Sequence, residues 1–140
     1  MKIIPHGAAR EVTGSCHEIQ VNGKKILLDC GLFQGHRQES AVKNAEFPFN
    51  PAEIDAMVLS HAHADHVGRV PLLSKKGFNA PIHCTYATKD LAAVMLADSA
   101  YINTKDEEYF CKYLAKSMMQ CDGPLYTIED AEECLTHFEG

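Results

Sequence analysis

The chain has 140 residues, 46% of them hydrophobic and 23% charged, and a formal net charge of −6 at pH 7. This composition is that of an ordinary globular protein with one core. The negative charge argues against a surface that binds nucleic acid by charge alone, and no apolar run approaches the roughly 20 residues of a membrane span.

The first part of the chain predicts three strands. Residues 2–5 predict a first short strand. The N-terminal sequence turns polar directly after it, so we expect no secretion signal and a cytoplasmic protein. Residues 16–21 alternate and end at Asn22-Gly23, a strong two-residue hairpin signal, and residues 25–29 form the returning strand. Residues 34–49 predict a loop with a short helix.

The middle of the chain alternates between strands and helices. Residues 54–60 predict a buried strand and residues 80–84 another. Residues 67–76 predict a helix, with Pro71 near its start and Gly77 as its C-cap. This alternation favours an α/β fold class.

The last part of the chain predicts two helices. Thr85 or Thr88 caps a long helix that runs to about residue 103. Residues 105–125 predict a partly helical excursion, and Thr127 opens a final helix that ends at Phe138. A stripe at helical spacing is expected to be the core face of the long helix: Ala87, Leu91, Val94, Met95, Ala97 and Tyr101.

Six cysteines are spread along the chain, and no two have C-x-x-C spacing. Without a secretion signal they are expected to meet a reducing cytosol. We therefore expect most of them to be core thiols rather than a disulfide framework or a zinc site.

Four side chains that can bind metals lie within six consecutive positions, directly after the strand at 54–60. They are His61, His63, Asp65 and His66. Imidazole suits zinc and iron, and carboxylates suit harder or borderline divalent metals. His61 and His63 point the same way in extended backbone, and a turn after Ala64 would direct the other two to a neighbouring metal. The pattern predicts metal binding, with zinc as the leading metal.

The segment HAHADH at 61–66 resembles the H-x-H-x-D-H signature of the metallo-β-lactamase superfamily. GAAREVTGSCH at 7–17 and LLDCGLFQG at 27–35 resemble the N-terminal signatures of its β-CASP branch of RNA-processing nucleases. Residues 81–102 and the helix after Thr127 also resemble that branch. The resemblance implies an α/β fold over residues 1–140, the N-terminal half of a metallo-β-lactamase αββα sandwich: a mixed sheet with flanking helices. The remainder of the domain and the β-CASP insertion would be absent.

The resemblance also implies roles for individual residues. His61 and His63 would bind one zinc ion, and Asp65 and His66 a second. Asp65 is in addition a candidate acceptor for the proton of the attacking water. Further ligands and the group that protonates the leaving oxygen would lie beyond residue 140.

Asp29 matches the first motif of the family and is expected to orient a ligand histidine or the nearby turn rather than to bind metal. Judged without the family, a simple turn residue is the stronger interpretation. His137 falls in the predicted final helix and is not assigned as a ligand. The inner face of the sheet, with Ile26, Leu28 and Val58, is expected to lack its covering sheet.

The activity implied for a full-length parent is zinc-dependent hydrolysis of RNA phosphodiesters in RNA processing or decay, with the 140-residue chain itself inactive. Two metals about 3.5–4 Å apart would activate water and neutralise the phosphate. One alternative is a hydrolase of the same fold that acts on a small ester, thioester or lactone. Another is a non-catalytic scaffold that partners a nuclease. RNA is the expected partner, and no membrane contact is expected. Whether the protein forms a homo-oligomer is left open by the sequence.

Overall fold

The computed structural model describes residues 1–114 and 123–140. Within them, six strands form one mixed sheet in the order β1-β2-β3-β4-β5-β6. The first three strands pair antiparallel, and the pairs β3–β4, β4–β5 and β5–β6 are parallel. The strands are β1 (Lys2–Gly7), β2 (Cys16–Val21), β3 (Lys24–Leu28), β4 (Ala56–Val58), β5 (Ile82–His83) and β6 (Phe138–Glu139).

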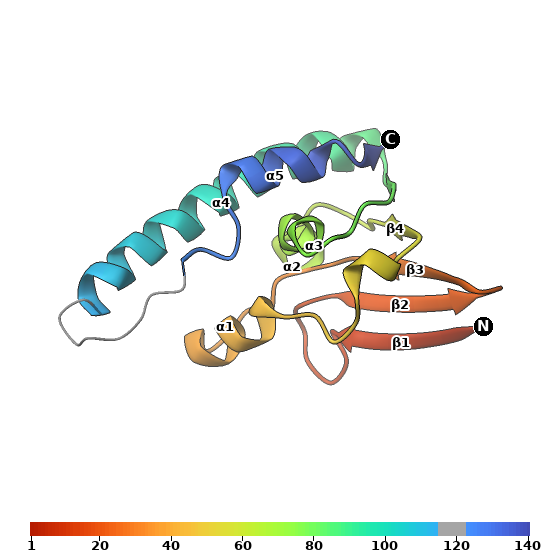
Figure 1. The fold of residues 1–140 in the computed structure, drawn as a ribbon, viewed down its shortest axis with the longest axis horizontal. Coiled ribbons are helices and arrows are strands. Elements are labelled where there is room, and N and C mark those ends of the chain that lie inside the picture. Colours follow the sequence, from red (N-terminus) through yellow and green to blue (C-terminus); the bar gives the residue numbers. More distant parts are fainter. Residues whose placement is uncertain (115–122) are drawn as a thin grey trace.

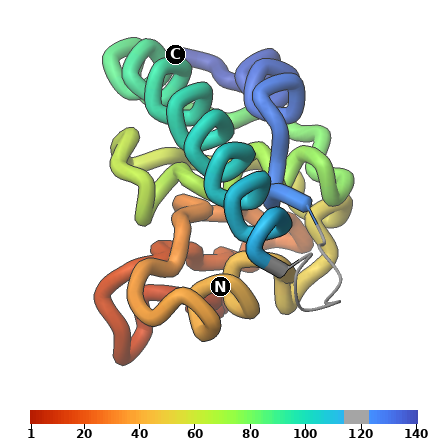
Figure 2. The backbone as a smooth tube through the Cα atoms, turned by 90° about the vertical axis from the view of Figure 1, so that its left-hand side faces the viewer, coloured from red at the N-terminus to blue at the C-terminus, as the bar shows by residue number. Residues whose placement is uncertain are grey.

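The helices form two layers over the sheet. In Figure 1, α2 and α3 lie between the strands β1 to β3 and the pair α4–α5, and Figure 2 shows the same layering from the side. The mixed sheet with flanking helices confirms the expected α/β class. The helices are α1 (Arg37–Ala45), the short 3₁₀ helix η1 (Pro51–Glu53), α2 (Ala64–Val67), α3 (Val70–Lys75), α4 (Tyr86–Leu114) and α5 (Ile128–Leu135).

The locally encoded features are confirmed. The hairpin between β2 and β3 turns at Asn22 and Gly23, whose φ angles are 51° and 77°; two positive φ angles define the turn that matches the twist of the strands. At the start of α5, Thr127 and Asp130 form a reciprocal capping box. Thr85 begins the long helix, because its hydroxyl accepts the backbone N–H of Thr88 at 3.2 Å.

Several predicted boundaries were wrong. The strand expected over 54–60 is shorter and covers only Ala56–Val58. The single helix expected over 67–76 is two helices, and the first begins already at Ala64. The long helix continues to Leu114, while residues 115–122 of the expected excursion lie outside the described residues.

The final helix was also predicted too long. It ends at Leu135, and Phe138–Glu139 form β6 instead. The carbonyl of His137 accepts the backbone N–H of Ile82 at 2.8 Å, so His137 belongs to this strand pairing and not to a helix. The hydrogen bonds offered by β5, which is distant in sequence, decide the conformation here.

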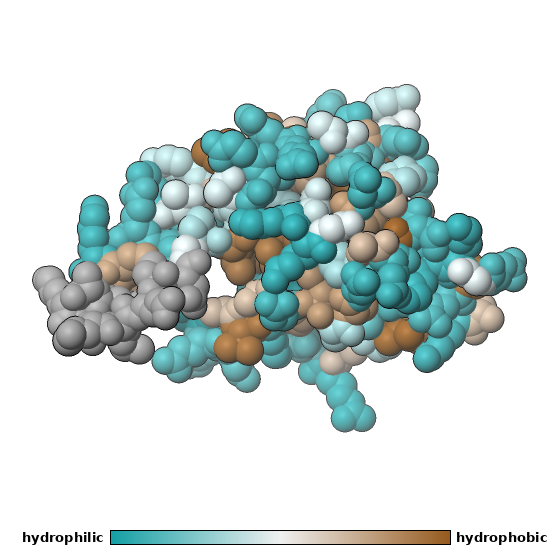
Figure 3. Space-filling view, in the orientation of Figure 1, coloured by the Kyte–Doolittle hydropathy of each residue, from teal (hydrophilic) through white to brown (hydrophobic). Residues whose placement is uncertain are grey.

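The core lies between the sheet and the helices. Leu27, Met57, Ile82 and Phe138 are paired neighbours across β3 to β6, and all are buried. In Figure 3, hydrophobic side chains gather in the middle of the face in view, and hydrophilic ones cover most of its periphery. Because strand side chains alternate, the next residue of each strand points to the opposite face. Val58 on that face is 40% exposed, and Ile26 and Leu28 are half-buried, so this face is less covered than the one that carries Leu27 and Met57.

The expected core face of the long helix was wrong. Leu91, Val94 and Tyr101 are more than half exposed, whereas Ala92, Leu96 and Ala100 are fully buried. Both stripes are apolar at helical spacing, and they differ by a rotation of one residue, about 100°. The helix α4 packs against α5, α2 and β6, and the stripe with Ala92, Leu96 and Ala100 is the one that becomes buried. No helix in the described ranges combines the length and apolarity that a membrane crossing requires.

Three cysteines are core thiols, as expected. Cys16, Cys30 and Cys134 are free and fully buried. Burial raises the pKa of the Cys134 thiol to about 12, which keeps it protonated and unreactive at neutral pH. Cys121 lies outside the described residues.

Candidate metal centre

The candidate site forms where the parallel strands β3 and β4 end side by side. Leu28 and Val58 are paired neighbours, so the residues that follow them leave the sheet at the same edge. The backbone N–H of Asp29 donates to the carbonyl of Val58 at 3.0 Å, and Asp29 itself has a φ of 59°. This left-handed conformation turns the chain away from the strand and leaves the carboxylate buried beside the loop after β4.

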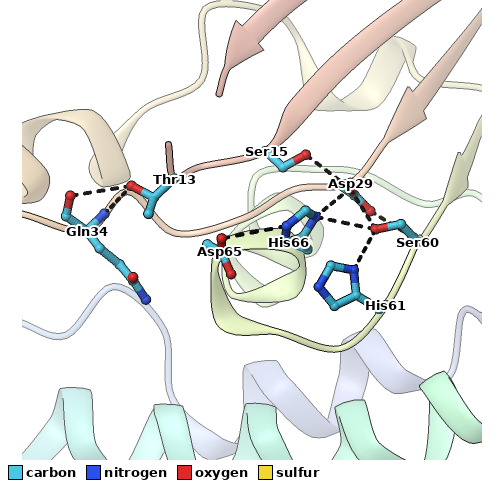
Figure 4. Close-up of polar contacts among 8 residues, drawn as sticks. All are labelled: Thr13, Ser15, Asp29, Gln34, Ser60, His61, Asp65 and His66. Atoms are coloured by element: carbon cyan, nitrogen blue, oxygen red, sulfur yellow. Dashed lines mark hydrogen bonds and ion pairs between the residues drawn. The ribbon is translucent and has the colours of Figure 1, made fainter. Parts of the chain in front are cut away.

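The Asp29 carboxylate accepts four hydrogen bonds. It accepts from the hydroxyls of Ser15 and Ser60 at 3.0 and 2.9 Å, and from the backbone N–H of Ser60 at 2.8 Å. The fourth contact, at 2.8 Å, is to Nδ1 of His66 (Figure 4). A carboxylate so fully engaged by protein donors is suited to orient its neighbours rather than to bind a metal ion itself.

The histidines of the HAHADH segment converge. The ring centroid of His61 lies 4.5 Å from that of His63 and 4.0 Å from that of His66. His63 is the N-cap of α2, so the backbone changes from extended to helical between His63 and Ala64. Asp65 and His66 therefore lie in the first turn of α2. The Asp65 carboxylate is 3.6 Å from Nε2 of His66.

The four candidate donors lie close together without forming a complete metal site. Within residues 1–114 and 123–140, no group of three or more His, Cys, Asp or Glu side chains is arranged to hold a metal ion. The spacing of 3.6 Å between Asp65 and His66 nevertheless fits one metal, because two ligands of tetrahedral zinc lie about 3.3 Å apart when each bond is about 2.0–2.1 Å. Because Nδ1 of His66 faces Asp29, its Nε2 is the atom left for a metal.

Backbone hydrogen bonds join α2 to the loop before β2 and to the loop after β3. The N–H groups of Ser15 and Cys30 donate to the carbonyls of Asp65 and His66, both at 2.8 Å. A Cβ at Gly31 would overlap the Asp65 carbonyl oxygen. Only glycine therefore allows the loop after β3 to lie directly against α2.

Arg69 contacts the loop after β3, although no local sequence pattern marks this residue as important. It is 1% exposed, and its Nε donates to the Gly31 carbonyl at 2.8 Å. Its guanidinium carbon lies 4.8 Å from the ring centroids of both Phe33 and Phe47. The arginine thus ties the loop after β3 to the segment around α1 by hydrogen bonding and cation–π contact. The site contacts of Ser15 and Ser60 were likewise not foreseen.

Two histidines outside the segment, His6 and His83, have polar partners of their own. Nε2 of His6 lies 2.9 Å from the Glu18 carboxylate, and its ring lies 4.7 Å from that of Phe49. His83 contacts Glu139 at the surface. Neither of these two histidines joins the convergent group.

Comparison with known proteins matches these features to one family. Residues 9–100 match the model of the metallo-β-lactamase superfamily. The chain is 44% identical over 137 residues to ribonuclease TTHA0252 of Thermus thermophilus, covering 98% of this chain and 27% of that protein. It is 35% identical over 116 residues to transcription termination factor FttA of Methanococcus maripaludis, covering 82% of this chain and 18% of that protein.

A third relative is a plant protein. The chain is 35% identical over 97 residues to cleavage and polyadenylation specificity factor subunit 3-II of Arabidopsis thaliana, covering 66% of this chain and 16% of that protein. The chain thus spans about a quarter of the length of these curated relatives, or less. It belongs to the metallo-β-lactamase superfamily, and its relatives place it in the β-CASP RNA-processing branch.

Proposed function

We propose that this chain carries the metal-binding motif of a zinc-dependent ribonuclease. The observation that carries the proposal is the convergence of His61, His63 and His66 beside Asp29, with Asp65 next to the free ring nitrogen of His66. The superfamily is metal-dependent, and imidazole and carboxylate donors of this kind suit zinc.

The donors are assigned in two pairs. His61 and His63 would hold one zinc ion, and Asp65 and His66 a second. When bound, the metals supply a Lewis acid and lower the pKa of a water molecule. The protein's own part is to orient His66 through Asp29 and to offer the Asp65 carboxylate as acceptor for the water's proton.

RNA is the proposed substrate. The relatives are named as a ribonuclease, a transcription termination factor and a cleavage and polyadenylation factor, which favours a phosphodiester over a small ester, thioester or lactone. All four local donors are present, which favours a catalytic protein over a scaffold homologue. We propose a cytoplasmic location, which the free, buried thiols of Cys16 and Cys30 favour.

Zinc binding to the chain tests the assignment of the ligands. Because only two donors face each proposed metal, we expect weak binding in equilibrium dialysis. The double variant His61→Ala/His63→Ala should lose most of it. His83→Ala, which removes a histidine outside the group, is the matched control and should bind as the unmodified chain does. Tight binding that survives the double substitution would place the metal elsewhere.

RNA cleavage tests the activity. We propose that the remaining ligands come from outside residues 1–140, so the chain alone should not cleave single-stranded RNA above a His63→Ala control. A longer protein that contains this chain should cleave it with zinc and lose the activity on His63→Ala. Zinc-dependent hydrolysis of a small ester without RNA cleavage would instead support the alternative hydrolase.

A further inference from the structure

Ser60 has more contacts with the candidate ligands than its position in the sequence suggests. It follows β4 and precedes the HAHADH segment, and its backbone N–H donates to Asp29 at 2.8 Å. Its hydroxyl oxygen lies 2.9 Å from the Asp29 carboxylate and 3.0 Å from Nδ1 of His61. A longer contact of 3.3 Å reaches Nδ1 of His66 (Figure 4).

A count of protons fixes the direction of these hydrogen bonds. An ionised carboxylate only accepts, and a serine hydroxyl carries a single hydrogen. Since the Ser60 hydroxyl donates to Asp29, its oxygen is left to accept. The hydrogen on the His61 side must therefore be on Nδ1 of the imidazole. A neutral imidazole has only one N–H, so Nε2 of His61 keeps its lone pair.

The same reasoning applies to His66 through a different partner. Its Nδ1 lies 2.8 Å from the Asp29 carboxylate, so this nitrogen also carries the hydrogen. Asp29 therefore sets the tautomer of one histidine directly. It reaches the other, His61, only through the Ser60 hydroxyl.

We propose that Ser60 is a positioning residue that holds His61 in the Nδ1–H tautomer and so presents its Nε2 to a metal. The consequence for metal binding rests on the function proposed above, whereas the tautomer itself does not. Outer partners of this kind fix ring orientation and typically change metal affinity 10–100-fold.

The competing interpretation is that Ser60 only supports Asp29. Ser15 offers a matched comparison, because its hydroxyl also donates to the Asp29 carboxylate, at 3.0 Å. Within the described residues, no hydrogen bond joins the Ser15 side chain to His61. A purely supporting role predicts the same effect for Ser15→Ala and Ser60→Ala, and a positioning role predicts that only Ser60→Ala affects His61.

The experiment reads the tautomer in the zinc-free chain. Long-range proton–nitrogen spectra with ¹⁵N-labelled histidine, recorded at alkaline pH, distinguish Nδ1–H from Nε2–H for each ring. We expect Nδ1–H for His61 in the unmodified chain and in Ser15→Ala. Ser60→Ala should shift His61 toward the Nε2–H form, which an imidazole without such a contact prefers in water. His66 should keep Nδ1–H, because it contacts Asp29 directly.

The pair Ser60→Thr and Ser60→Val separates the hydroxyl from any effect of size, since the two side chains have the same shape. Ser60 is exposed, so the extra methyl group has room. Threonine should restore the Nδ1–H tautomer, and valine should not. In zinc dialysis, the valine variant should bind at least about tenfold more weakly than the threonine variant.

Equal His61 tautomers in the threonine and valine variants would overturn the proposal. If the threonine and valine variants both bind zinc with equal affinity, the positioning role is overturned as well. If no form of the chain binds zinc but the tautomer follows the hydroxyl, the contact between Ser60 and His61 is supported and the proposed metal function has failed instead.

Discussion

Nδ1 of His66 lies 2.8 Å from the carboxylate of Asp29, a residue 37 positions earlier in the chain. This contact joins the loop after β3 to the first turn of α2 and leaves the other ring nitrogen of His66 facing Asp65. The two residues come together because β3 and β4 are parallel neighbours that end at the same edge of the sheet. The candidate site therefore depends on the sheet as much as on the histidine cluster.

Replacing Asp29 by asparagine should weaken both the fold and zinc binding. The amide cannot accept all four hydrogen bonds, and buried donors are left without partners. We expect a loss of about 1–3 kcal/mol in the free energy of unfolding by urea, and at least about tenfold weaker zinc binding. Asp55→Asn, at a surface ion pair with Lys24, should leave zinc binding unchanged. An Asp29→Asn chain with unchanged stability and zinc affinity would contradict the orienting role.

Gly31→Ala should be far more damaging than Gly23→Ala. At Gly31 the new Cβ meets the backbone of Asp65, which cannot move without displacing α2. At Gly23 there is open space, and the cost is only the positive φ of 77°. We expect about 3 kcal/mol or more for the first and about 1 kcal/mol for the second, measured by urea unfolding. Equal losses would show that the two loops do not need their close contact.

Arg69→Lys should destabilise the chain although the charge is kept. Lysine lacks the planar group that donates to the carbonyls of Gly31 and Lys43 and packs between two phenylalanine rings. We expect a loss of about 3 kcal/mol in the free energy of unfolding. Arg37→Lys is the control: Arg37 is exposed and lies over one ring, that of Phe110, so its change should stay below about 1 kcal/mol.

Glu18→Gln should change the dependence of stability on pH. Burial by itself would raise the pKa of the Glu18 carboxyl, but hydrogen bonds from Gln20 and His6 outweigh it and leave this pKa below its ordinary value of 4.5. A lowered pKa contributes stability that is present above the unfolded pKa and is lost as the pH falls through the folded pKa.

Urea unfolding at a series of pH values tests this directly. Glu18→Gln should be less stable than the unmodified chain at neutral pH, and the difference should shrink on acidification below 4.5. Glu132→Gln, on the exposed side of α5, controls for the loss of a negative charge. A constant difference at all pH values would contradict the prediction.

The uncovered sheet face should make the chain associate. Ile3, Ile19 and Ile26 are paired neighbours across β1, β2 and β3, and Ile3 is 59% exposed. Contiguous exposed apolar surface favours association. Ile3→Lys should therefore reduce the apparent mass in size-exclusion chromatography at increasing concentration. Val42→Lys removes an exposed apolar side chain on α1, away from this row, and should have no effect; an equal effect would rule out the sheet face as the cause.

The sequence by itself determined the features that depend on a few neighbouring residues. Asn22-Gly23 specifies the hairpin turn through its positive φ angles, and Thr127 with Asp130 specifies a helix start through two local hydrogen bonds. The density of donors in the HAHADH segment likewise marked the candidate ligands, and the resemblance to a known family suggested a role for Asp29.

Only the tertiary structure decided the rest, because those features depend on residues that are distant in the chain. β6 exists through its pairing with β5, and the face that α4 buries is decided by the elements that pack against it. Arg69 and Ser60 became recognisable only when the Gly31 carbonyl and the Asp29 carboxylate were placed beside them. A local pattern shows which side chains can bind a metal ion, whereas their orientation comes from hydrogen bonds that the fold brings together.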